Sequence, residues 1–164
     1  MKAPLFTEMN ASELLERYAT GERNFAGIYV RGKLNGAILS DANFCGAVFP
    51  NSMEGIDFSR SYLIGADLAE VNLLNGILRN VRLDGVNLCQ SLLGGADLTD
   101  ACLARTDLDE TLMENTNLHR ANLIGAFGVD VEYWLEQGCI FCHTTMPDGS
   151  ERNDGCQRLG INVD

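Results

Sequence analysis

A large apolar residue recurs at every fifth position over much of this sequence. From Phe58 to Leu123, each fifth residue is Phe, Leu or Met. A small or β-branched residue stands two places before each of these centres, as Ala66 does before Leu68. Neither the 3.6-residue period of a helix nor the 2-residue period of a strand gives a spacing of five. The pattern therefore predicts a short extended piece followed by a turn, repeated many times.

In an extended piece, residues two apart point to the same side. Each centre and the small residue two places before it would then face inward, and the other three residues would face outward. Four such pieces and four turns close a square coil of about 20 residues, and stacked coils would pair their backbones at about 4.8 Å. The sequence thus predicts an all-β solenoid.

Individual units resemble the A(D/N)LXX repeats of the pentapeptide repeat family. The matching units include Ala66–Glu70, Ala96–Asp100 and Ala121–Gly125. The resemblance extends over residues 25–127. It implies a right-handed quadrilateral β-helix of about five coils.

The five-residue register is interrupted at two places. Phe49 and Met53 are four residues apart, and a second one-residue deletion falls between Val30 and Leu34. We expect each deletion to distort one corner without ending the stack.

Both ends of a stacked solenoid need covering. Residues 1–24 are predicted to form an N-terminal segment with a capping helix at about 11–20, in which Asn10 is the N-cap and Gly21 the stop. Residues 128–164 are predicted to form a C-terminal cap. In that cap a helical turn is followed by an extended segment, a Pro-Asp-Gly turn and a return segment.

The cap contains a Cys-x-x-Cys-His sequence at Cys139–His143, the pattern of c-type haem attachment. Zinc binding is a second interpretation, and a Cys142–Cys156 disulfide is a third. The fourth treats the cysteines as small apolar cap residues. We favour the fourth and predict no metal or cofactor. The zinc interpretation would use Cys139, Cys142, His143 and Cys156. The Thr-Met-Pro-Asp-Gly stretch at 145–149 is similar to tails of cyanobacterial pentapeptide repeat proteins.

Charge and apolar patterning exclude several classes of function. The net charge is −11, from 23 acidic and 12 basic residues, which argues against binding nucleic acid through its phosphates. The apolar runs are too short to span a bilayer, and the N-terminus lacks the apolar core of a signal peptide. These features predict a cytoplasmic protein that is a monomer or a weak dimer, bound to neither nucleic acid nor membrane.

The register also assigns outward residues to faces, since every fourth unit returns to the same side. The face with centres Leu68, Leu88 and Leu108 carries five carboxylates and no basic residue. We call these the acidic strip: Asp67, Glu70, Asp107, Asp109 and Glu110. The next face carries three outward leucines, the leucine strip: Leu74, Leu92 and Leu112.

Contiguous exposed apolar residues mark partner sites or surfaces that another segment covers. We predict that the leucine strip, the acidic strip and Ile77 around the corner form an interface. The alternative is that a terminal segment folds over the leucines. No arrangement of catalytic residues is recognisable, and a convex wall offers no cleft to desolvate the carboxylates.

The predicted function is therefore that of a non-enzymatic interaction or regulatory scaffold for a protein whose identity the sequence does not give. The alternative, implied by the family resemblance, is a DNA mimic that acts on a type II topoisomerase through the acidic strip.

Overall fold

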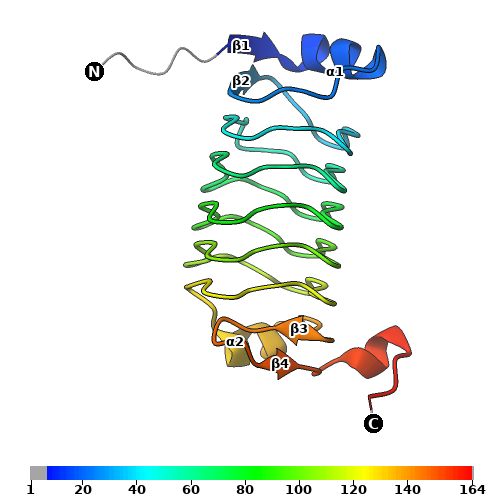
Figure 1. Cartoon of the computed structure of the whole chain (residues 1–164), viewed down its shortest axis with the longest axis vertical. Coiled ribbons are helices and arrows are strands. Elements are labelled where there is room, and N and C mark those ends of the chain that lie inside the picture. The colour runs from blue at the N-terminus through cyan, green and yellow to red at the C-terminus, as the bar shows by residue number, and fades with distance from the viewer. Residues whose placement is uncertain (1–6, 164) are drawn as a thin grey trace.

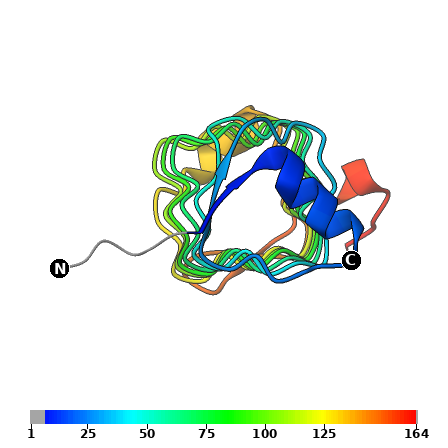
Figure 2. The ribbon, with the colours of Figure 1, turned by 90° about the horizontal axis from the view of Figure 1, so that it is seen from above.

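The chain forms a column of stacked coils with a helix at each end (Figure 1). The computed structural model describes residues 7–163. Seen along the column axis, the coils superpose into a four-sided outline, and the N-terminal helix crosses it (Figure 2). No helix in residues 7–163 has the length and apolarity needed to cross a membrane.

Parallel backbone pairing sets the repeat of the coils. Between Ser52 and Phe127, paired residues are 20 apart, as in the series Asp57–Ile77–Asp97–Asn117. Pairs that span the deletion between Phe49 and Met53 are 19 apart, for example Ile38 with Asp57. Asn24 and Asn43, which span the earlier deletion, are also 19 apart. Each deletion therefore shortens one coil by one residue and leaves the stacking intact.

Most corners of the column are tight turns. The carbonyl of a centre accepts a hydrogen bond from the amide three residues later, as Leu63 does from Ala66 at 2.9 Å. The residue before that amide has a positive φ, 70° at Gly65 and 57° at Glu70. A left-handed conformation costs a non-glycine residue about 1–2 kcal/mol, so the cooperative stack holds many corners in a locally unfavourable geometry.

Asp and Asn just before the centres close these turns. The Asn72 side-chain oxygen accepts the Leu74 amide at 3.0 Å, and Asp97 accepts the Thr99 amide at 3.0 Å. Such side-chain bonds to the backbone two residues on are the usual role of Asp and Asn in turns. They explain why Asp or Asn recurs at this position, and they make Leu92 and Leu112, at the same position, exceptions.

Buried apolar centres and inward hydroxyls fill the interior. Leu63, Leu93 and Leu103 are fully buried, and the rings of Phe25 and Phe44 stack with centroids 5.3 Å apart. Inward threonines donate to carbonyls of the preceding coil, as Thr106 does to Leu83 at 3.0 Å. These bonds satisfy polar groups that would otherwise destabilise the core.

The N-terminal end is covered by a strand and a helix. Strand β1 (Thr7–Asn10) pairs in parallel with β2 (Ile28–Arg31), and β1 was not expected from the sequence. Helix α1 (Ala11–Ala19) follows directly. The Asn10 side chain accepts the Glu13 amide at 2.9 Å, and Leu14 is completely buried in the core.

At the other end, helix α2 (Val131–Glu136) interrupts the last coil. Phe127 still pairs with Asp107 on the acidic face, and the chain next rejoins the stack where Ile140 pairs with Asn117 and Thr145 with Asn122. These last two spacings are 23 residues instead of 20. Helix α2 therefore lies where the next rung of the leucine face would be.

The remaining segment forms a small hairpin beside α2 at the C-terminal end of the column (Figure 1). Strands β3 (Thr144–Thr145) and β4 (Glu151–Arg152) pair antiparallel. A short 3-10 helix, η1 (Cys156–Leu159), follows.

Candidate functional site

The acidic strip runs along one corner of the column. Asp67, Asn87 and Asp107 pair with one another in successive coils. Within residues 7–163, none of the five carboxylates of the strip forms an ion pair. By contrast, arginines elsewhere are paired, for example Arg60 with Asp41 at 2.6 Å and Arg120 with Asp100 at 2.8 Å. The acidity of this corner is therefore uncompensated.

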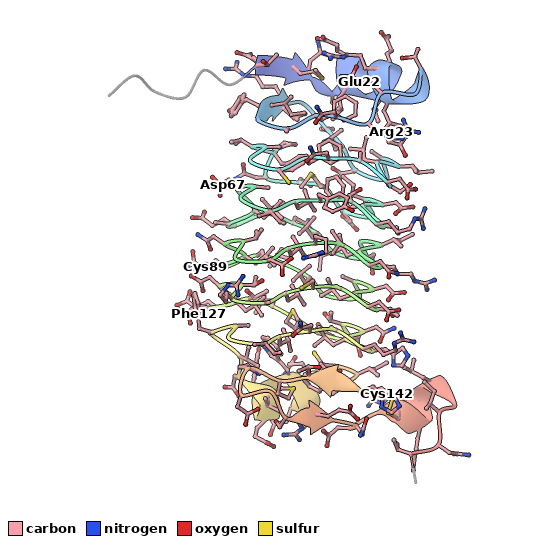
Figure 3. All side chains as sticks on the ribbon, viewed as in Figure 1. Glu22, Arg23, Asp67, Cys89, Phe127 and Cys142 are labelled. Atoms are coloured by element: carbon pink, nitrogen blue, oxygen red, sulfur yellow. A yellow bond between two sulfur atoms is a disulfide. The ribbon has the colours of Figure 1, made fainter. Side chains whose placement is uncertain are left out.

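The negative charge of the acidic strip affects the pKa of Cys89. Burial raises the pKa of its thiol, and the carboxylates of Asp107, Asp109, Glu110 and Glu70 raise this pKa further. Nearby negative charges disfavour a thiolate. Four carboxylates thus contribute to the raised pKa of this one thiol. Cys89 lies on the same side of the column as Asp67 (Figure 3).

Two residues of the leucine strip border a hollow near the C-terminal end of the column. Leu92 and Leu112 pair directly in successive coils. Leu112 is 50% exposed, and Leu92 is half-buried. Both line a pocket of about 600 Å³, whose far wall is made by Tyr133 and Trp134 of α2. Helix α2 takes the place of the next rung of this face after Leu112. The two leucines are therefore not covered by a further coil and border the pocket instead.

The pocket combines an apolar wall with an acidic rim. Asp109, Glu110 and Asp130 supply the carboxylates, and Gln90 donates to Glu110 at 2.6 Å. The hydroxyl of Thr111, which also lines the pocket, donates to the Leu88 carbonyl in the core. This arrangement suits a cationic group carried on an apolar segment.

The structure gathers only some of the predicted interface residues. Leu92, Leu112, Asp109 and Glu110 line the pocket. Asp67 and Glu70 line a separate hollow of about 300 Å³.

The remaining three residues lie elsewhere on the column. Leu74 lies over Gly94, where an added Cβ would come within 3.0 Å of its side chain. Ile77 lies on the neighbouring face and is 42% exposed. Asp107 stays on the acidic face beside Phe127. The predicted surface is thus divided between the pocket and its surroundings.

Sequence reasoning missed the contribution of α2. Trp134 of α2 is buried, and its ring stacks on Phe141 with centroids 6.5 Å apart. Trp134 and Tyr133 lie in the pocket wall because the last coil has 23 residues instead of 20. The exposed Phe127 was also missed, although it occupies the position where Asp or Asn is usual.

The tail cysteines separate into two environments. Cys142 and Cys156 form a disulfide, the third of the four interpretations. Cys139 is buried apart from them, its thiol donates to the Met113 carbonyl, and burial raises its pKa to about 11. The four-ligand zinc set that includes Cys139 is therefore not assembled. Cys142 lies across the column from Cys89 and Phe127 (Figure 3).

Comparison with known proteins finds repeats of one family. Residues 56–95 and 91–127 match the family of pentapeptide repeats. No curated protein matches the chain.

Several solved structures are similar to the chain. The pentapeptide repeat protein alr5209 from Nostoc PCC 7120 is 24% identical over 84% of this chain and 98% of its own, with a TM-score of 0.44. Rfr23 from the cyanobacterium Cyanothece 51142 is 22% identical over 74% and 80%, with a TM-score of 0.39. Full-length QnrB1, a plasmid-mediated fluoroquinolone resistance protein, is 19% identical over 88% and 76%, with a TM-score of 0.44.

Proposed function

We propose that the chain is a non-enzymatic protein-interaction module, and the match of residues 56–127 to the family of pentapeptide repeats supports this proposal. Its partner binds at the pocket between the leucine strip and α2. The observation that carries this proposal is the pocket in which Leu92 and Leu112 meet residues of α2. The carboxylates on its rim form no ion pair within residues 7–163.

The chemistry of the pocket indicates the kind of partner. The apolar wall supplies affinity by burying a large apolar side chain, and the acidic rim attracts and orients a basic neighbour. We therefore expect a partner segment in which Lys or Arg adjoins a large apolar residue. Association should slow as ionic strength rises, because salt screens the exposed carboxylates.

A matched capture experiment tests the proposal. Tagged wild type and a Leu92→Glu/Leu112→Glu variant are used to recover proteins from native lysate, which are identified by mass spectrometry. Ile124→Glu is the control, since Ile124 is similarly exposed, at 48%, and lies outside the pocket. A partner retained by the control and lost by the double variant is expected. A partner retained by all three proteins would contradict the proposed location.

The second candidate function is DNA mimicry toward a type II topoisomerase. The favouring observation is the acidic strip, whose carboxylates form no ion pair within residues 7–163. Regularly spaced negative charge on a rigid rod could occupy a basic DNA-binding surface.

A supercoiling assay separates this candidate from the first. An Asp67→Asn/Glu70→Gln/Asp107→Asn variant removes charge, and Asn keeps the side-chain oxygen that closes each turn. Inhibition of the topoisomerase by wild type and its loss in this variant would favour mimicry. Absence of inhibition by wild type would exclude it.

A further inference from the structure

Three potential metal ligands meet at the corner opposite the pocket. The Sγ atoms of Cys142 and Cys156 and one ring nitrogen of His143 all lie within 4.8 Å of one another. Both cysteines are buried and His143 is half-buried. Thiolate sulfur and imidazole nitrogen are the preferred ligands of zinc.

The backbone around these ligands is held from several sides. The Cys142 carbonyl accepts the Arg120 amide at 2.8 Å, which fixes it to the preceding coil. The Cys142 amide donates to the Thr144 hydroxyl at 3.1 Å. The His143 amide donates to the Asn153 side chain at 2.8 Å. A supported backbone keeps ligand groups near a binding geometry.

His143 has a carboxylate beside its ring, as ligating histidines commonly do. Its Nδ1 lies 3.1 Å from a carboxylate oxygen of Glu151. In metal sites a carboxylate commonly accepts the N–H of a ligating histidine, which fixes the tautomer and leaves the other nitrogen free to bind. With Nδ1 bound to Glu151, Nε2 is the atom available to a metal.

A second histidine faces the same corner. The rings of His119 and His143 have centroids 6.2 Å apart, and His119 Nδ1 lies 3.0 Å from the Cys142 carbonyl oxygen. When Nδ1–H donates to that oxygen, Nε2 of His119 carries a free lone pair. His119 is therefore a neighbour of the cluster and not one of its three ligands, and the fourth position of a tetrahedral site is left to water or to a movement of His119.

We propose that the reduced Cys142 and Cys156, together with His143, bind Zn²⁺, and that the disulfide excludes the ion. Zinc–sulfur bonds of about 2.3 Å in a tetrahedral site hold two sulfurs about 3.8 Å apart. Sulfurs joined in a disulfide are not thiolates and cannot bind zinc in this way, so the two states are mutually exclusive. The site is therefore controlled by oxidation.

The redox step requires a reductant, for which a trialkylphosphine serves in vitro. The phosphine transfers two electrons to the S–S bond and becomes the phosphine oxide by taking the oxygen of water. The two protons of that water go to the two sulfurs. Zinc binding then releases the thiol protons, since zinc binds thiolates.

Metal titration of the full chain tests the proposal. Zinc affinity is measured by competition with a chromophoric chelator, before and after phosphine reduction. Co²⁺ is added in parallel as a spectroscopic probe. We expect stoichiometric binding by the reduced chain alone, with the ligand-field and thiolate charge-transfer bands of tetrahedral Co²⁺. Equal affinity of the oxidised chain, or reduced chain that binds no zinc, would overturn the proposal.

Variants locate the site. His143→Asn keeps the disulfide and a residue type that tolerates the positive φ of 51° at this position. It should weaken zinc binding at least about 100-fold, and Glu151→Gln about 10–100-fold. Cys45→Ser removes a free cysteine outside the cluster and should change nothing. Unchanged affinity in His143→Asn, or loss in Cys45→Ser, would overturn the assignment.

The role of His119 is decided in the same titration. If His119 supplies the fourth ligand, His119→Gln weakens zinc binding and alters the Co²⁺ spectrum; if water does, both remain as in wild type. In either case the ligands Cys142, Cys156 and His143 are required. Circular dichroism of the reduced chain checks that the β-helix remains folded.

Discussion

Two serines at equivalent inward positions differ in their hydrogen bonds. The Ser61 hydroxyl donates to the Leu39 carbonyl at 2.9 Å and accepts the Ala42 amide at 3.1 Å. The buried Ser91 hydroxyl has no hydrogen-bond partner among residues 7–163. A buried polar group without a partner is destabilising.

Replacement by alanine should therefore affect the two sites in opposite ways. Ser61→Ala leaves two backbone groups unpaired and should lower the free energy of unfolding by about 1–2 kcal/mol. Ser91→Ala should leave it unchanged or raise it by up to about 1 kcal/mol. Urea unfolding midpoints of the two variants test this contrast. Equal losses at both sites would show that Ser91 is hydrogen-bonded in solution.

The field of the acidic strip should appear in the chemistry of Cys89. Because the pKa of its thiol is raised, the reactive thiolate is scarcer at neutral pH than in an unperturbed thiol. Asp109→Asn/Glu110→Gln should lower this pKa, shift the alkylation profile to lower pH and speed the reaction at neutral pH. Peptide mapping after timed iodoacetamide treatment measures the rate at Cys89. A rate unchanged by both the variant and added salt would show that burial alone sets the pKa.

At the residue scale, the sequence predicted which side chains face inward and which outward. The inward set follows from the five-residue register alone, since each turn repeats the same geometry. The role of Asp and Asn before the centres was not predicted, because the side-chain bond to the amide two residues on becomes visible only with the backbone. Leucine cannot form that bond, so its presence at positions 92 and 112 points to another role, such as contact with a partner.

Among the elements, α2 has the largest effect on the candidate site. The Asp130 side chain accepts the Tyr133 amide at 3.0 Å and caps this short helix. Loss of such a cap costs about 0.5–2 kcal/mol. Because α2 is short, loss of the cap should weaken the packing of α2 against the last coil. The coils above it should be little affected.

Asp130→Ala should thus loosen α2 and leave the β-helix intact. Trp134 is the one tryptophan of the sequence and is buried against Phe141, so its fluorescence reports the docking of α2. We expect a red-shifted emission and weaker partner binding with unchanged far-ultraviolet β-sheet signal. An unshifted emission would mean that Asp130 does not hold the helix in place.

The position of α2 relative to the stack could not be predicted from the sequence. The sequence indicated the end of the repeats at residue 127 and a helical turn in the C-terminal cap that follows. It did not indicate that the chain would resume pairing at Ile140 and Thr145, since that depends on a 23-residue spacing without a repeat signal. The pocket exists because of that spacing, and its α2 wall was accordingly missed.

At the scale of the whole molecule, the two candidate sites occupy opposite corners of one rigid column. The pocket and acidic strip lie on the side of Cys89 and Phe127, and the cysteine–histidine cluster lies on the side of Cys142 (Figure 3). Both are built where the C-terminal segment departs from the regular coil. The repeats themselves supply a stiff support, and the function is assigned to the irregular end.

The most direct test of the central claim is site-specific photo-crosslinking in cells. A benzophenone amino acid is placed at position 112, inside the pocket, or at position 124, at a similarly exposed site outside it. Adducts are identified by mass spectrometry. A protein partner crosslinked from position 112 and not from position 124 is predicted. The same adducts from both positions, or adducts from position 124 alone, would contradict a partner site at the leucine strip and α2.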